Sequence, residues 1–124
     1  MTVTPNPARS SETPAPVLPD PLAAMFGVLG RRWSPHVLYL LGQRPARFTE
    51  LQRAIAGISD NSLNGRLRDL IAEGLVLRRA FPGPPMTSSY ETTPLGQAIA
   101  DHLIRMATTP ALSDPHPSLG QTVR

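Results

Sequence analysis

The stretch ISDNSLNGRLRDLIAEGLVLRRAF restricts the fold of this chain more than any other part of the sequence. Leu63, Leu67 and Leu70 recur at helical spacing and form one apolar stripe. Ser59 is a typical N-cap for this helix, and Gly74 is a typical end. The strand-like segment LVLRRAF follows without a linker. A helix that runs directly into a strand predicts a small domain in which both elements share one core.

A second helix pattern ends just before this stretch. Residues 48–56 bury Leu51 and Ile55, and the short turn GIS leads from them into the helix at residues 59–73. Beyond LVLRRAF, the segment TSSYETT reads as a second strand, and no helix can cross the intervening PGPPM. Two short helices joined by a tight turn and followed by a hairpin predict a winged helix-turn-helix.

The remaining patterns complete a mainly α fold with a small β-hairpin wing. We expect a short helix from Leu22 to Leu29 and a second one with Ser34 as its N-cap. Thr49 and Gln52 predict a capping box at the start of the third helix. The last helix is expected to begin after a Thr93 cap and to carry an apolar stripe, which consists of Leu95, Ile99, Leu103 and Met106.

Proline marks the expected domain boundaries. Nine of the 15 prolines lie in residues 1–21 and 110–124, which are rich in serine and threonine and have few groups to bury. We expect both segments to be flexible tails. Residues 22–109 form the predicted winged helix-turn-helix domain.

Charge and composition exclude several classes of function. All 12 basic residues are arginine, and residues 22–109 carry ten of them against six acidic residues, which suits an acidic partner such as nucleic acid. The chain has no cysteine, which rules out thiol chemistry and cysteine zinc sites. The apolar runs are too short for a membrane span, so we expect a cytoplasmic protein without a membrane partner.

Catalytic and metal-site patterns are also missing from the sequence. It contains no Gly-rich phosphate loop, nucleophile motif or paired carboxylates, so we expect no enzyme and no cofactor. The three histidines, His36, His102 and His116, have no second ligand at metal-binding spacing, so we expect no metal site.

The helix at residues 59–73 presents a polar face opposite its leucine stripe. In a winged helix-turn-helix, the second helix reads base edges in the DNA major groove. Asparagine pairs with adenine, arginine with guanine, and serine with either base or with phosphate. Gly65 costs about 1 kcal/mol relative to alanine in mid-helix, which suits a close backbone approach. The predicted residues for base readout are Asn61, Ser62, Gly65 and Arg68; the alternative is an ordinary solvated face.

Three pieces of the chain together resemble the HxlR family of bacterial winged-helix transcriptional regulators: LGRRWSPHVLYLL, RFTELQRAIAGISDNSLNGRLRDLIAEGLVLRRAFP and YETTPLG. This resemblance implies a homodimeric repressor or activator on a pseudo-palindromic operator, and we expect a repressor. It also implies that the first and last helices pair across a two-fold axis, although their apolar stripes could instead close the monomer's core. The implied dimer contacts are Leu22, Phe26, Leu29, Ile99, His102, Leu103 and Met106.

The chain departs from the family pattern at several places: Thr92 stands where the family favours a leucine, Arg31 replaces a small residue before Trp33, and two further departures bear on function. It lacks the cysteine that the family often carries near its first helix, so a thiol sensor is excluded. After its prolines, the hairpin reads Met86-Thr87-Ser88-Ser89, where the family usually carries a basic residue. Insertion of an arginine into the minor groove is therefore not expected, whereas the hydroxyls of Thr87 and Ser88 can still bind phosphates.

The predicted phosphate contacts surround the helix pair and the hairpin. Arg66 is left open between a phosphate contact and an internal ion pair. Arg78 and Arg79 alternate faces in the strand, so at most one of them faces DNA. The full set is Arg47, Thr49, Ser59, Arg66, Arg78, Arg79, Thr87 and Ser88.

The sequence thus predicts a regulator that binds specific sites in double-stranded DNA as a homodimer. The alternative is a winged-helix module for protein contact, which the weakly basic wing supports. A small-molecule effector is left open; its pocket would lie among the apolar residues between the terminal helices and Trp33. Trp33 itself is most simply a core residue, with the floor of a ligand cavity as the alternative.

Overall fold

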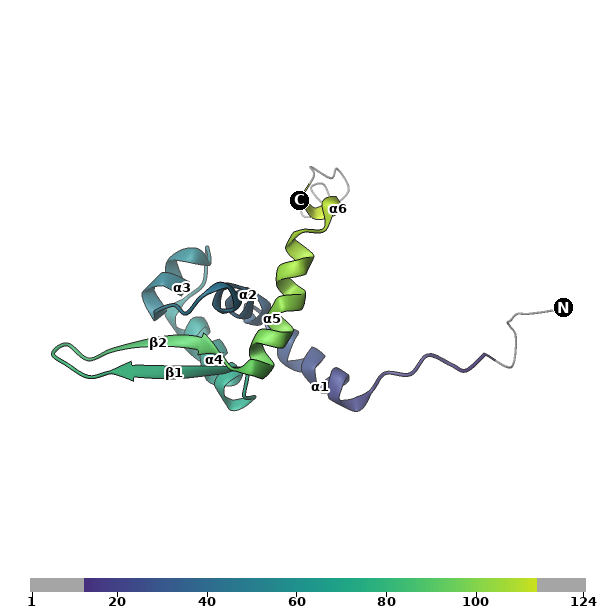
Figure 1. Cartoon of the computed structure of the whole chain (residues 1–124), viewed down its shortest axis with the longest axis horizontal. Coiled ribbons are helices and arrows are strands. Elements are labelled where there is room, and N and C mark those ends of the chain that lie inside the picture. Colours follow the sequence, from purple (N-terminus) through teal and green to yellow (C-terminus); the bar gives the residue numbers. More distant parts are fainter. Residues whose placement is uncertain (1–12, 114–124) are drawn as a thin grey trace.

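The computed structural model describes residues 13–113 and confirms the predicted winged helix-turn-helix. In Figure 1 the hairpin projects from one end of the helical body, and α1 points away at the other end. The elements in chain order are α1 (Asp20–Leu29), α2 (Ser34–Gln43), α3 (Phe48–Ala54), α4 (Asp60–Ala72), β1 (Val76–Phe81), β2 (Thr87–Thr92), α5 (Pro94–Ala107) and α6 (Pro110–Ser113).

The core lies where α2, α4, α5 and the base of the hairpin meet. Gly96 and Gly42 allow this packing: a Cβ at Gly96 would overlap the carbonyl of Leu75, and one at Gly42 would overlap the Cβ of Ala100. The largest buried side chains come from both parts of the predicted helix pair and from their neighbours. They include Val37, Leu38, Leu41, Leu51, Leu63, Leu70, Leu75 and Val76.

Two of the predicted helix caps are confirmed. The hydroxyl of Ser59 accepts a hydrogen bond from the backbone N–H of Ser62 at 3.0 Å. The hydroxyl of Thr93 accepts one from the N–H of Gly96, also at 3.0 Å. These caps fix the starts of α4 and α5, so both helices flank the hairpin as the sequence predicts.

Two other predicted caps are wrong. Ser34 lies inside α2, and the N-cap is Trp33, whose backbone adopts a left-handed conformation with φ of 78°. The third helix begins at Phe48, so Thr49 is already helical. Its start is stabilised by Glu50, whose carboxylate accepts the backbone N–H of Arg47 at 2.8 Å. Both starts depend on how the preceding chain enters the helix, which the cap residue alone does not reveal.

The hairpin is antiparallel, and its register pairs Arg78 with Tyr90 and Arg79 with Ser89. Ala46, in the link between α2 and α3, forms an additional bridge to Tyr90. Two backbone hydrogen bonds of 3.0 and 2.8 Å join Ala46 to Tyr90. This bridge ties the hairpin to the segment that leads into α3, so the wing and the helix pair share a fixed arrangement.

The predicted domain boundaries differ slightly from the observed elements. The first helix starts at Asp20 rather than Leu22, with Pro21 in its first turn. The short helix α6 occupies residues 110–113, at the start of the expected C-terminal tail. Residues 13–19 of the expected N-terminal tail are exposed and lie in no helix or strand. Residues 1–12 and 114–124, which include His116, lie outside the described residues.

Candidate nucleic-acid interface

The second helix of the pair, α4, presents a polar face to solvent. Its leucines at 63, 67 and 70 are buried, whereas Asn61 and Arg68 are exposed, and Ser62 and Gly65 are half-buried. A Cβ added at Gly65 would meet no atom within 4 Å. No neighbour within the monomer therefore demands glycine at this position. The structure brings the four predicted base-reading residues together on one accessible surface.

Arg68 and Arg66 have different surroundings. Arg66 donates to Asp69 through Nε at 3.1 Å and Nη2 at 2.9 Å, and Arg31 contacts the same carboxylate at 3.2 Å. Arg66 therefore takes the internal ion pair, one of its two predicted roles. Within residues 13–113, Arg68 makes no hydrogen bond or ion pair. Its guanidinium is thus available to a partner.

Asn64 is a candidate that the sequence reasoning missed. Its side chain is exposed on α4, three residues after Asn61 and four before Arg68. Residues at these spacings are neighbours on a helix surface. The spacing was therefore the signal that could have identified Asn64, and we add it to the candidate base-reading surface.

The start of α3 carries the next two predicted contacts. Arg47 and Thr49 are exposed there. The nearby Glu50 carboxylate accepts the Arg47 N–H and lies 3.3 Å from Nη2 of Arg44. These two contacts hold the pKa of Glu50 below its ordinary value of 4.5, the backbone hydrogen bond being the larger cause. Glu50 is thus engaged locally, and the guanidinium of Arg47 stays exposed.

The two strand arginines face opposite sides of the hairpin, as predicted. Arg79 forms an ion pair of 2.9 Å with Glu91, which raises the pKa of the arginine. Arg78 is exposed, and we find no ion pair for it in the described part of the chain. Arg78 is therefore the better candidate for a phosphate contact.

A polar groove of about 550 Å³ lies between the start of α3 and the hairpin. It gathers Arg47 and Thr49 with Arg44 and with the wing residues Phe81 and Ser89. Thr87 and Ser88 are half-buried in the outer part of β2, whereas Phe81 and Met86 are exposed. The wing therefore offers hydroxyl and apolar groups toward its tip, and its arginines lie nearer the base.

The expected dimer contacts are partly uncovered in the single chain. Leu22, Phe26 and Met106 are 43%, 53% and 54% exposed, respectively. His102 is exposed beside Arg105, with Nδ1 2.7 Å from Nη2 of that arginine. The other three residues, Leu29, Ile99 and Leu103, are half-buried against the core. The apolar stripes of α1 and α5 thus close the core only in part.

The described residues show neither a metal-binding cluster of three histidine or carboxylate side chains nor a helix able to span a membrane. They do show a tight helix pair, a hairpin wing and an arginine- and asparagine-bearing outer helix face. These features define the winged helix-turn-helix fold, which many DNA-binding regulators share.

The chain belongs to the HxlR-like helix-turn-helix family, whose model matches residues 28–111. It is 39% identical over 72 residues to the uncharacterized HTH-type transcriptional regulator YkvN of Bacillus subtilis. It is 35% identical over 74 residues to the uncharacterized HTH-type transcriptional regulator BH0655 of Halalkalibacterium halodurans. These matches cover 58% and 59% of this chain, and 61% and 66% of the two relatives' own length.

Solved structures agree with this assignment. The reduced form of the transcriptional regulator YodB from B. subtilis superposes with a TM-score of 0.65 at 26% identity. The superposition covers 80% of this chain and 100% of that one. The family and the fold are therefore established by independent comparisons.

Proposed function

We propose that this chain is a cytoplasmic repressor that binds a pseudo-palindromic operator in double-stranded DNA as a homodimer. The single observation that carries the proposal is the outer face of α4, where exposed amide and guanidinium groups have no partner within the described chain. Since the family consists of regulators, we propose a binding function and no catalysis.

Base readout is assigned to Asn61, Asn64 and Arg68, with Ser62 and Gly65 beside them. An asparagine amide matches the N6 and N7 atoms of adenine, and a guanidinium matches O6 and N7 of guanine. The side chains of Asn61, Asn64 and Arg68 are exposed on one face of α4. A DNA major groove, about 12 Å wide, admits an α-helix that presents such a face. Gly65 lets the helix backbone approach the DNA more closely than any other residue would.

Phosphate anchoring is assigned first to Arg47, Thr49 and Arg78, which are exposed. Ser59 accepts within its own helix, but its hydroxyl hydrogen can still be donated to a phosphate oxygen. Thr87 and Ser88 offer further donors on the wing. Arg66 and Arg79 would have to leave their carboxylates to bind phosphate, so we place them second.

The homodimer is supported by the exposed apolar residues of α1 and α5. At least two fifths of the surface of Leu22, Phe26 and Met106 is exposed. Contact of large apolar side chains with water costs free energy, which a dimer interface would recover. A two-fold axis through these helices would place two copies of α4 about 34–36 Å apart, one turn of DNA.

A second candidate function is protein contact without specific DNA binding. The observation in its favour is the wing tip, where Phe81 is 47% and Met86 is 69% exposed and no basic side chain follows the prolines. Apolar tips of this kind suit a protein surface.

Fluorescence anisotropy with the duplex upstream of the protein's own coding region distinguishes the two functions. Salt is varied from about 50 to 200 mM, with excess non-specific competitor present. The regulator binds saturably, resists the competitor and weakens steeply with salt. If even low salt gives no binding to this duplex or to a pool of random duplexes, the protein-contact function takes its place.

A further inference from the structure

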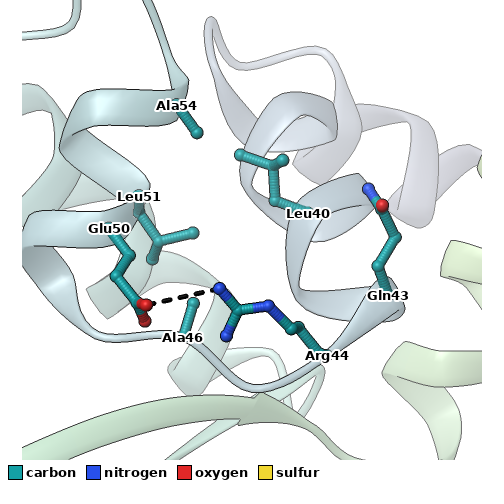
Figure 2. Close-up of a pocket in the computed structure, with 7 residues that line it drawn as sticks. All are labelled: Leu40, Gln43, Arg44, Ala46, Glu50, Leu51 and Ala54. Atoms are coloured by element: carbon teal, nitrogen blue, oxygen red, sulfur yellow. Dashed lines mark hydrogen bonds and ion pairs between the residues drawn. The ribbon is translucent and has the colours of Figure 1, made fainter.

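We propose that the groove between α2 and α3 binds a small amphipathic carboxylate, with its carboxylate on Arg44 and its apolar body extending toward Trp33. The groove consists of two neighbouring hollows of about 340 and 430 Å³, which share Leu40 and Ala54. Each falls within the usual size range of small-molecule sites. Figure 2 shows the first hollow, where Leu40 from α2 faces Leu51 and Ala54 from α3.

One end of the groove is charged. Arg44 spans the opening toward Glu50, with 3.3 Å between Nη2 and the carboxylate (Figure 2). The Arg44 side chain is 67% exposed, and ion pairs this exposed contribute little. The other Glu50 oxygen is held by the Arg47 N–H. Arg44 can therefore turn to a ligand carboxylate while Glu50 keeps its hydrogen bond at the start of α3.

The other end of the groove is aromatic. His36 and Tyr39 line it from α2, together with Trp33 just before α2 and Ile55 just after α3. The Trp33 ring is half-buried, with the His36 ring against it at 5.0 Å and the Arg32 guanidinium 4.6 Å from its centre. A phenyl or alkyl group suits this lining. The groove thus selects a molecule with one anionic end and one apolar end.

The expected location of an effector pocket differs from this one. A smaller hollow of about 250 Å³ lies between α2 and α5 and is lined by Pro35, His36, Tyr39, Leu103 and Met106. Trp33 does not line it, and its lining holds no arginine. The α2–α3 groove contains both Trp33 and a cation, so we assign the ligand there.

Binding in this groove would regulate DNA affinity, a step that rests on the proposed function. The groove is walled by α3, the first helix of the DNA-reading pair. A carboxylate on Arg44 frees Glu50 from its ion pair and adds a second negative charge near Arg47, the proposed phosphate anchor. Both changes oppose phosphate binding. The ligand should therefore lower operator affinity.

Trp33 provides a direct test, because it is the only tryptophan in the chain and lines the groove. The probes are 4-phenylbutyrate and its neutral analogue 4-phenylbutanol, titrated into the full chain with the tryptophan fluorescence as readout. We expect saturable binding of the acid at least tenfold tighter than of the alcohol, as for a charge-assisted contact. No saturable change, or equal affinities, would overturn the proposal.

Three variants locate the site. Arg44→Gln should raise the Kd of the acid about tenfold and leave that of the alcohol unchanged. Ala54→Leu, at an exposed position shared by both hollows, should weaken both probes. Arg53→Gln removes an exposed charge from the same helix outside the groove and should change neither. If Ala54→Leu unfolds the chain, Arg44→Gln still tests the site. An unchanged preference of this variant for the acid over the alcohol would show that the acid binds outside the groove.

Operator affinity with and without the acid tests the regulatory step separately. Binding of the acid with unchanged operator affinity would overturn only that step. Binding of the acid by a chain that recognises no operator would refute the proposed function and leave the ligand site standing.

Discussion

Arg68 is the residue on which base readout depends most, because its guanidinium is exposed and has no partner within the described chain. Arg68→Ala should cost about 1–3 kcal/mol of operator binding and relax base choice at one position in each half-site. Anisotropy against a set of single-base operator variants measures both effects. Arg53→Ala, which removes an exposed arginine from α3, is the charge-matched control. An equal loss on every duplex would show that Arg68 binds phosphate.

Arg47 should behave differently, since it lies at the start of α3 and is assigned to the DNA backbone. Arg47→Ala should weaken all duplexes alike and reduce the slope of log K against log salt by about 1. The backbone N–H that Glu50 accepts is retained in the variant. Titrations at several salt concentrations check the slope, and a base-specific loss would contradict the assignment.

Glu50 should make stability depend on pH. Because the Arg47 N–H and then Arg44 lower its pKa in the folded chain, the ionised form favours folding. This contribution is complete above the ordinary pKa of 4.5 and is lost as pH falls through the lower folded value. The Glu50→Gln variant should therefore have a lower free energy of unfolding than the natural chain at pH 7. This difference in free energy should narrow near pH 3. Urea unfolding at both pH values measures it, with Glu73→Gln as the exposed control.

At the scale of the element, α4 combines a weak helix residue with a reading role. Gly65→Ala should raise the free energy of unfolding by about 0.8–1 kcal/mol, because alanine favours the helix and its Cβ meets no atom within 4 Å. The same methyl group should lower operator affinity if the helix backbone approaches DNA there. Thermal unfolding and anisotropy are measured on the same variant. Greater stability with unchanged affinity would make Gly65 a tolerated weak point rather than part of the readout.

At the scale of the whole molecule, two chains are expected to meet through α1 and α5. Phe26→Glu should shift the protein from dimer to monomer, since it places a charge in the expected apolar interface at a residue that is 53% exposed in the single chain. Light scattering after gel filtration measures the mass. Met86→Glu, on an even more exposed apolar residue at the wing tip, is the control and should leave the dimer intact. A monomeric natural chain would refute the dimer outright.

Local signals predicted much of this molecule. The periodic leucines fixed which face of α4 is buried, and hence which polar residues face outward, since both follow from helix geometry alone. The hydroxyl caps at Ser59 and Thr93 were equally predictable, because each bonds to a backbone group three residues away.

Contacts between distant segments were decided only by the tertiary structure. Arg66 has an adjacent acceptor in Asp69, but the approach of Arg31 from a distant segment completes that cluster. The left-handed backbone of Trp33 and the cap at Arg47 depend on how each helix is entered, and the groove between α2 and α3 depends on how two helices pack. The sequence determined the elements and their faces, since those follow from spacing along one helix or strand. The tertiary structure decided which arginine stays unpaired and where a groove forms, because both depend on distances between segments that are far apart in the sequence.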